Sequence, residues 1–229
     1  MPLFRRREVW LPTLWGGCVL IAGAALLVVA LGVNANRLLA LDEPVRGQDG
    51  AGARTLVVEG WMDEPELAQA LAVFRRGHYQ RVLTTGGPIE PWGDVGGWQT
   101  YAQRGAAFLR SNGLADVPVI AVPAHDVKQD RSYLNALMVR DWASRSGASL
   151  GAIDVVSAGV HARRSRLVYR MALGDAVEVG VIAAAPQGFD AQRWWTSSSG
   201  VKSTIGEALS LAWTACCFWP AAPPGDTPM

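Results

Sequence analysis

The sequence predicts an α/β domain built on a doubly wound, mostly parallel sheet of five strands or slightly more. We expect helices on both faces of this sheet and one transmembrane helix before it. Three observations lead to this prediction. From Arg54 onward, short apolar segments alternate with amphipathic ones, which is typical of parallel sheets. Most of the short segments end in glycine or polar residues. Near the N-terminus lies a long run without charge.

The charge-free run extends from Leu14 to Val33. At a rise of about 1.5 Å per residue it is long enough to cross the ~30 Å hydrocarbon core of a bilayer. Arg5, Arg6 and Arg7 precede it, and no positive excess follows it. By the positive-inside rule, residues 1–13 are cytoplasmic and the main domain is extracytoplasmic. The sequence therefore predicts a single-pass protein of the plasma (inner) membrane.

The alternative for this run is a cleaved signal peptide. Val33-Asn34-Ala35 has the small residues of a cleavage site. The apolar run is nevertheless longer than the roughly 7–15 residues of a usual signal sequence. We therefore expect an uncleaved anchor over residues 14–33, and cleavage stays open as the alternative.

Residues 34–53 mix polar residues with glycine and proline and lack apolar periodicity, so we expect a linker. The α/β domain then covers residues 54–219. Thr55–Glu59 has the composition of a buried strand, and Pro65–Arg76 places Leu67 and Leu71 on one helical face. Further strands are predicted at 81–85, 117–122, 153–157 and 177–183, further helices at 100–111, 130–146, 161–173 and 204–218, and a flexible tail at 220–229.

Composition limits the partners. The net charge is +1 and no stripe of lysine and arginine occurs, so we expect no nucleic-acid partner. No Cys/His cluster has zinc-ligand spacing, and we expect no metal site. Cys216 and Cys217 are adjacent, which is too close for an ordinary bridge to each other. The sequence indicates neither a cofactor nor a protein partner.

The segment from Asp154 to Ser165 is the strongest candidate for a site. A β-branched strand ends near Ser157, and His161, Arg163 and Arg164 then open a helix. Cations added to the positive end of a helix dipole form a site for an anion. Arg164 lies three residues after His161 and shares its side of the helix, whereas Arg163 points elsewhere and is expected to be solvated or structural.

Other strand ends add candidates, because the carboxyl ends of parallel strands share one edge of the sheet. The backbone amides of Thr85-Gly86-Gly87 could bind an anion, or the segment could be only a strand-ending turn. Asp130 is expected at a helix N-terminus, as a cap or a ligand contact, and Asn135 is expected to make a polar contact.

Glu59 ends the first strand, and with Asp63 it could form an acid/base pair. Glu66 could instead serve the start of the following helix. Glu207 interrupts the apolar run of the last helix, so we expect that helix to pack on the sheet rather than to contact a membrane a second time.

Three of these motifs occur in the order seen in a known family. They are Thr85-Gly86-Gly87, the segment from Asp130 to Asn135, and the turn from Ser157 to Arg164. Over residues 54–215 the chain resembles the DUF218 family, which contains the YdcF-, SanA- and ElyC-like proteins of bacteria. The resemblance implies an α/β fold and, for membrane-anchored members, a link to the cell envelope, without supplying a reaction.

Together these observations predict an anchored bacterial envelope protein that binds an anionic small molecule, for example a phosphate-bearing envelope precursor. We expect Thr85, Gly86, Gly87, Asp130, Asn135, Ser157 and Arg164 to bind the ligand. If the protein is a hydrolase or transferase, His161 and Glu59 are the candidate catalytic residues. The alternative is a non-catalytic ligand-binding or scaffolding module, and the sequence leaves open whether the protein is an enzyme.

Overall fold

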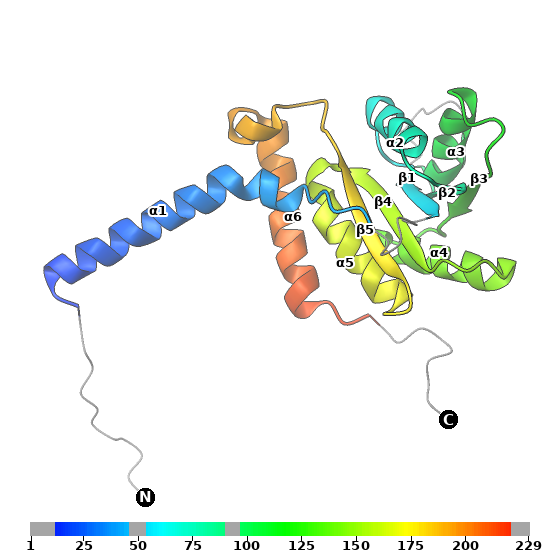
Figure 1. The fold of residues 1–229 in the computed structure, drawn as a ribbon. Coiled ribbons are helices and arrows are strands. Elements are labelled where there is room, and N and C mark those ends of the chain that lie inside the picture. The colour runs from blue at the N-terminus through cyan, green and yellow to red at the C-terminus, as the bar shows by residue number, and fades with distance from the viewer. Residues whose placement is uncertain (1–11, 46–53, 90–96, 221–229) are drawn as a thin grey trace, which may run out of the picture. The chain divides into compact units, whose positions relative to one another are not determined.

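The computed structural model describes residues 12–45, 54–89 and 97–220. The chain divides into two compact units, residues 1–35 and residues 36–229. The second unit is an α/β domain around a five-stranded sheet of order β3-β2-β1-β4-β5 (Figure 1). All its neighbouring strands are parallel, which confirms the predicted fold class. The strands are β1 (Thr55–Glu59), β2 (Arg81–Gly86), β3 (Val119–Pro123), β4 (Ala152–Ala158) and β5 (Glu178–Ala184).

Helices cover both faces of the sheet (Figure 1). On one face, α2 (Glu64–Arg76) and α3 (Tyr101–Ser111) pack on Leu56, Val58 and Val82. On the other, α4 (Arg131–Ser146) and α5 (Ala162–Leu173) pack on Val57, Val155 and neighbouring strand residues. Successive strand residues point to opposite faces, so the continuous apolar runs of β1 and β4 supply both cores.

Three shorter or later elements complete the domain. A 3-10 turn, η1 (Gly159–His161), joins β4 to α5, and another, η2 (Ala191–Thr196), precedes α6 (Ser198–Cys217). The helix α6 lies beside α5 (Figure 1). It begins six residues before the predicted start at residue 204. The Ser197 hydroxyl accepts a hydrogen bond from the Gly200 amide at 3.0 Å and caps a first turn whose polar residues showed no apolar periodicity.

The first part of the predicted linker is structured, and residues 46–53 lie outside the described residues. The N-terminal helix α1 (Leu14–Leu39) continues six residues beyond the predicted span, and Leu39 is buried. Glu43 then pairs with Val181 on the outer edge of β5, and the Val45 amide donates to the buried Asp154 carboxylate at 2.7 Å. Residues 36–45 therefore belong to the domain. Tertiary contacts to a sheet edge leave no periodicity in a sequence, which is why they were missed.

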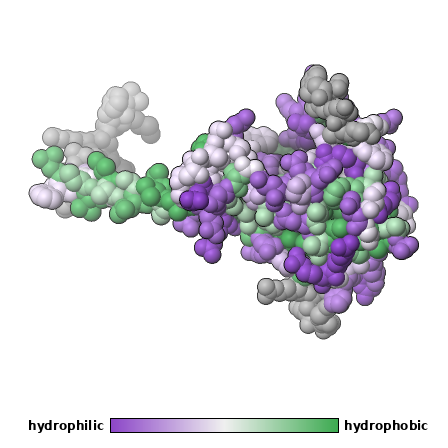
Figure 2. All heavy atoms as spheres, turned by 90° about the horizontal axis from the view of Figure 1, so that it is seen from above, coloured by the Kyte–Doolittle hydropathy of each residue, from purple (hydrophilic) through white to green (hydrophobic). Residues whose placement is uncertain are grey.

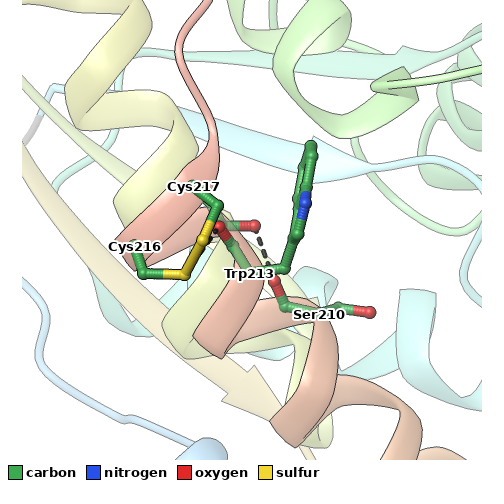
Figure 3. Close-up of a disulfide and its surroundings, with 5 residues drawn as sticks. Ser210, Trp213, Cys216 and Cys217 are labelled. Carbon is green, nitrogen blue, oxygen red and sulfur yellow. Dashed lines mark hydrogen bonds between the residues drawn. A yellow bond between two sulfur atoms is a disulfide. The ribbon is translucent and has the colours of Figure 1, made fainter.

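Adjacent cysteines at the end of α6 form a disulfide, contrary to the expectation (Figure 3). The Cα atoms of Cys216 and Cys217 are 3.8 Å apart, which is shorter than in ordinary bridges. The pair lies where the helix ends, and both residues are exposed. Because α6 ends at Cys217, no helical turn follows the small ring that the disulfide closes.

The sequence of α1 is apolar for most of its length, and apolar side chains cover most of the face of this helix that Figure 2 shows. Its most apolar 18-residue window has a mean hydropathy of 2.5, and none of that window is buried. The helix is long and apolar enough for a single membrane span, and a signal sequence has the same character. Its last turn, from Asn36 to Leu39, is part of the α/β domain.

Candidate functional site

The turn that carries His161 lies at the carboxyl end of β4, as the sequence predicts. Gly159 has a φ of +34°, a value that favours glycine, and the chain turns there from strand into η1. His161 directly precedes α5, and Arg164 lies in its first turn. The local backbone therefore places both side chains at the positive end of α5.

A carboxylate from another helix contacts both of these side chains. Oε1 of Glu207, on α6, lies 2.9 Å from His161 Nδ1. Arg164 donates from Nε to Glu207 Oε2 at 2.8 Å and from a terminal nitrogen to Oε1 at 3.0 Å. This is a two-pronged arginine–carboxylate contact with a histidine on the same oxygen. Arg164 also donates to the Ser132 hydroxyl at 3.2 Å, at the start of α4.

The electrostatics of this cluster favour the charged forms. Burial alone would raise the pKa of Glu207, but hydrogen bonds from His161 and Arg164, together with their charges, lower it to about 2. Burial would lower the pKa of Arg164, but the hydrogen bond and charge of Glu207 raise it above its usual range. Glu207 is therefore a carboxylate at neutral pH and compensates the charge of Arg164.

Sequence reasoning missed Glu207 as part of the site. In the sequence, Glu207 is only a break in the apolar run of the last helix. In the structure it is 7 % exposed and turned toward α5. The available signal was a lone acid in an apolar helix together with two cations at a helix start. A buried charge needs a partner, and these were the natural ones.

Glu59 lies in a separate buried network at the end of β1. Its carboxylate accepts hydrogen bonds from the Ser157 hydroxyl at 2.6 Å and from the Ser165 hydroxyl at 2.9 Å. Only 1 % of Glu59 is exposed, and burial raises its pKa, partly offset by the two serine hydrogen bonds and by the charges of His161 and Arg164. Glu59 and Ser157 thus lie beneath the ion cluster, enclosed by protein.

The candidate acid/base pair of Glu59 and Asp63 is not formed. Asp63 precedes α2, and its amide donates to Glu66 Oε2 at 3.1 Å. Burial raises the pKa of Glu66, partly offset by that hydrogen bond. Glu66 therefore serves the start of α2, as its spacing from Asp63 suggests.

The turn Thr85-Gly86-Gly87 is occupied by packing and borders neither cavity described below. The Thr85 hydroxyl is buried 3.3 Å from the Tyr169 hydroxyl. At Gly86 a Cβ would lie 2.6 Å from the Cβ of Tyr101, at the start of α3. The Gly87 carbonyl accepts the Tyr101 amide at 3.0 Å. Gly86 allows α3 to approach the sheet.

Asp130 and Asn135 have different surroundings. Asp130 lies at the N-cap position of α4, but its φ of 56° is left-handed and its side chain makes no capping hydrogen bond. The prediction that the Asp130 side chain caps α4 is therefore wrong, since a capping residue normally has an extended backbone. Asn135 is buried, and its Oδ1 has no hydrogen-bond partner among the described residues. An unpaired buried oxygen costs about 1–3 kcal/mol.

Two cavities flank the ion cluster. The first, of about 480 Å³, borders Arg164, Ser132 and Asp130 on one side and the α6 side chains Leu209 and Trp213 on the other. The second, of about 200 Å³, borders His161 and Trp61. The Trp61 ring meets the His161 ring edge-on, with centroids 4.9 Å apart. His161 and Arg164 thus face different cavities across the Glu207 carboxylate.

The other arginine of the motif is structural. Arg163 donates from Nε to the Leu38 carbonyl in the last turn of α1. This contact holds residues 36–39 on the domain, in agreement with the structural role expected for Arg163.

His161 and Arg164 both carry hydrogen-bond donors that contact a carboxylate. Within residues 12–45, 54–89 and 97–220, no three His, Cys, Asp or Glu side chains gather as a metal site requires. Comparison with models of known protein families and with curated proteins found no match to the chain. The cluster of His161, Arg164 and Glu207 is therefore the feature of the molecule that best indicates its function.

Proposed function

We propose that this chain is a single-pass protein of the bacterial inner membrane whose extracytoplasmic domain binds a small anionic molecule. The resemblance to the DUF218 family links the chain to the cell envelope, and a phosphate-bearing envelope precursor is an anionic molecule of that compartment. The binding groups are His161 and Arg164 at the start of α5, and Glu207 occupies them when no ligand is bound.

The observation that carries the proposal is the bound carboxylate itself. Arg164 and His161 together hold both oxygens of Glu207 at 2.8–3.0 Å. A phosphate oxyanion has the same hydrogen-bonding needs, and arginine pairs with phosphate in the same two-pronged manner. The donors of His161 and Arg164 are therefore already positioned for an anion, and the Glu207 carboxylate is the anion that they bind in this structure.

The larger cavity gives a ligand room next to the cluster. It borders Arg164 and the N-terminal turn of α4, where the helix dipole favours negative charge. Asp130 stands at its edge in a left-handed conformation that is rare outside glycine. Strained residues of this kind cluster at ligand sites, which supports this cavity as the place of binding.

Topology and redox chemistry support the location. Three arginines precede the apolar helix, which favours a cytoplasmic N-terminus. Cys216 and Cys217 are joined in a disulfide, and disulfides persist mainly outside the cytosol.

Isothermal titration calorimetry of the full-length protein in nanodiscs tests the proposal, with inorganic phosphate and pyrophosphate as probes. We expect Arg164→Ala to abolish binding. Glu207→Gln should strengthen binding, because it removes the competing carboxylate. Arg145→Ala is the control, since its exposed ion pair with Asp141 lies on another part of α4. Absence of binding to both the wild type and Glu207→Gln would overturn the proposal.

A second candidate function is hydrolysis or group transfer with His161 as the acid/base. The observation that favours it is the Glu207 contact at His161 Nδ1, because a carboxylate there orients an imidazole for proton transfer at its other nitrogen. Turnover of p-nitrophenyl phosphate separates the two ideas. In an enzyme, Glu207→Gln lowers turnover, whereas in a binding module there is no turnover and Glu207→Gln only strengthens binding.

A further inference from the structure

The outer face of α6 is apolar and largely exposed; of its side chains, Leu209 and Trp213 also border the larger cavity, and the Trp213 ring contacts the Phe218 ring. Ile205, Leu209 and Trp213 are 49 %, 68 % and 50 % exposed. Ala208, Ala212 and Cys216 lie between and beyond them on the same side of the helix and are also exposed. We call these six residues the α6 stripe.

The one acid in this part of the helix does not interrupt the stripe. Glu207 points to the opposite side, where it binds His161 and Arg164, and Thr204 and Thr214 are also buried there. From residue 203 to residue 220, Glu207 is the sole charged residue. The exposed face is therefore free of charge. Glu207 interrupts the apolar run in the sequence, but it does not prevent this face from contacting a membrane.

The membrane anchor enters the domain beside this stripe. Residue 36 is the first residue of the α/β unit, and the apolar helix precedes it directly. The Asn36 side-chain nitrogen donates to the Thr204 hydroxyl at 3.3 Å, one residue before the stripe begins at Ile205. If the preceding helix spans the bilayer, the chain leaves the lipid at the start of the stripe.

From this juxtaposition we propose that the α6 stripe lies on the bilayer surface, with its apolar side chains in contact with lipid. This inference rests on the proposed membrane anchor. The buried polar side of α6 excludes a second span, so the contact is that of an interfacial amphipathic helix. Trp213 and Trp219, which is 86 % exposed, suit such a position because tryptophan favours the membrane–water interface.

The end of α6 extends the same face. The disulfide joins Cys216 to Cys217, and Cys216 lies one helical turn after Trp213 (Figure 3). An oxidised pair carries no thiol hydrogen and presents an apolar sulfur surface. The contact surface thus continues from Ile205 to the last turn of the helix.

Quenching of tryptophan fluorescence by brominated phosphatidylcholine tests the inference in the full-length protein reconstituted into vesicles. The emission of Trp213 is obtained as the wild type minus Trp213→Phe. Trp98 is 45 % exposed and precedes α3, remote from α6 in the sequence, and it provides the matched control through Trp98→Phe. We expect brominated lipid to remove more than half of the Trp213 emission and to leave the Trp98 emission nearly unchanged.

Two results would overturn the inference. One is Trp213 emission that brominated lipid does not quench while aqueous acrylamide does. The other is protection of Trp213 from both quenchers in a cross-linkable dimer, which would make a second copy of the chain the occupant. Intact mass and alkaline extraction report separately whether residues 1–35 remain as an anchor. A cleaved helix would remove the premise, whereas an intact anchor with unquenched Trp213 would refute the stripe alone.

Discussion

At the scale of single residues, Glu207 determines the character of the site. Without it, the charge of Arg164 would lie uncompensated at the positive end of α5, beside His161, which is unfavourable. With it, His161 and Arg164 form a compensated cluster that also fixes α6 against α5. The same carboxylate therefore serves stability, and in our proposal it competes with the ligand.

Replacing Glu207 should destabilise the domain measurably. Glu207→Ala leaves the largely buried Arg164 without its carboxylate, and breaking such a pair costs on the order of 3 kcal/mol. Asp141→Ala removes the carboxylate of an exposed pair and should cost less than about 1 kcal/mol. Urea unfolding followed by circular dichroism measures both. Equal effects of the two substitutions would show that the Glu207 cluster is not a strong contact.

The stability contributed by Glu207 should depend on pH in a defined direction. Its pKa is about 2 in the folded protein against an ordinary value of 4.5, so folding favours the carboxylate. The contribution is therefore complete above about pH 4.5 and is lost as the pH falls toward about 2. The difference in unfolding free energy between the wild type and Glu207→Gln should shrink over that range. A difference independent of pH would contradict the cluster.

At the scale of elements, glycines allow α3 to lie close to the sheet. At Gly60 a Cβ would lie 2.3 Å from the Tyr101 carbonyl oxygen, and Gly105 on α3 faces the Gly60 Cα. Gly86 makes the same approach from β2. The Gly-Gly turn after β2 therefore has a packing role that accounts for at least one of its glycines without a ligand.

Substitution at Gly60 should test this close approach. Gly60→Ala forces α3 away from the sheet, and overpacking of this kind costs about 1–3 kcal/mol. Gly188 has nothing within 4 Å of a built Cβ, so Gly188→Ala should be nearly neutral. Thermal unfolding of the two variants compares them directly. A Gly60→Ala variant as stable as Gly188→Ala would show that the helix can move at little cost.

At the scale of the whole molecule, the connection between the apolar helix and the sheet is structured. Residues 36–45 contact the domain through Asn36, Leu39, Glu43 and Val45. They cover part of the edge of β5 and donate a hydrogen bond to the buried Asp154 carboxylate. Burial raises the pKa of Asp154, and its hydrogen bonds with Val45 and Tyr79 partly offset that rise. The residues that follow the apolar helix are therefore held on the sheet edge and on α6.

Truncation should reveal this dependence. A chain that begins at Asn36 keeps the contacts to Asp154 and Val181, whereas a chain that begins at Arg54 loses them. Loss of a hydrogen bond to a buried carboxylate costs about 1–3 kcal/mol. The shorter chain should unfold at a clearly lower temperature in calorimetry. Equal unfolding temperatures would show that residues 36–45 do not stabilise the domain and act only as a linker.

The sequence by itself determined the properties that depend on neighbours along the chain. Alternating apolar segments predicted every strand to within two residues at its start, and the run from Leu14 to Val33 predicted the apolar helix. Tertiary structure alone decided which polar groups meet. Glu207 reaches Arg164 across 43 residues, and Val45 reaches Asp154 across 109. Periodicity shows which face of an element is buried, but packing selects the partner on that face, and here it placed Glu207 against His161 and Arg164.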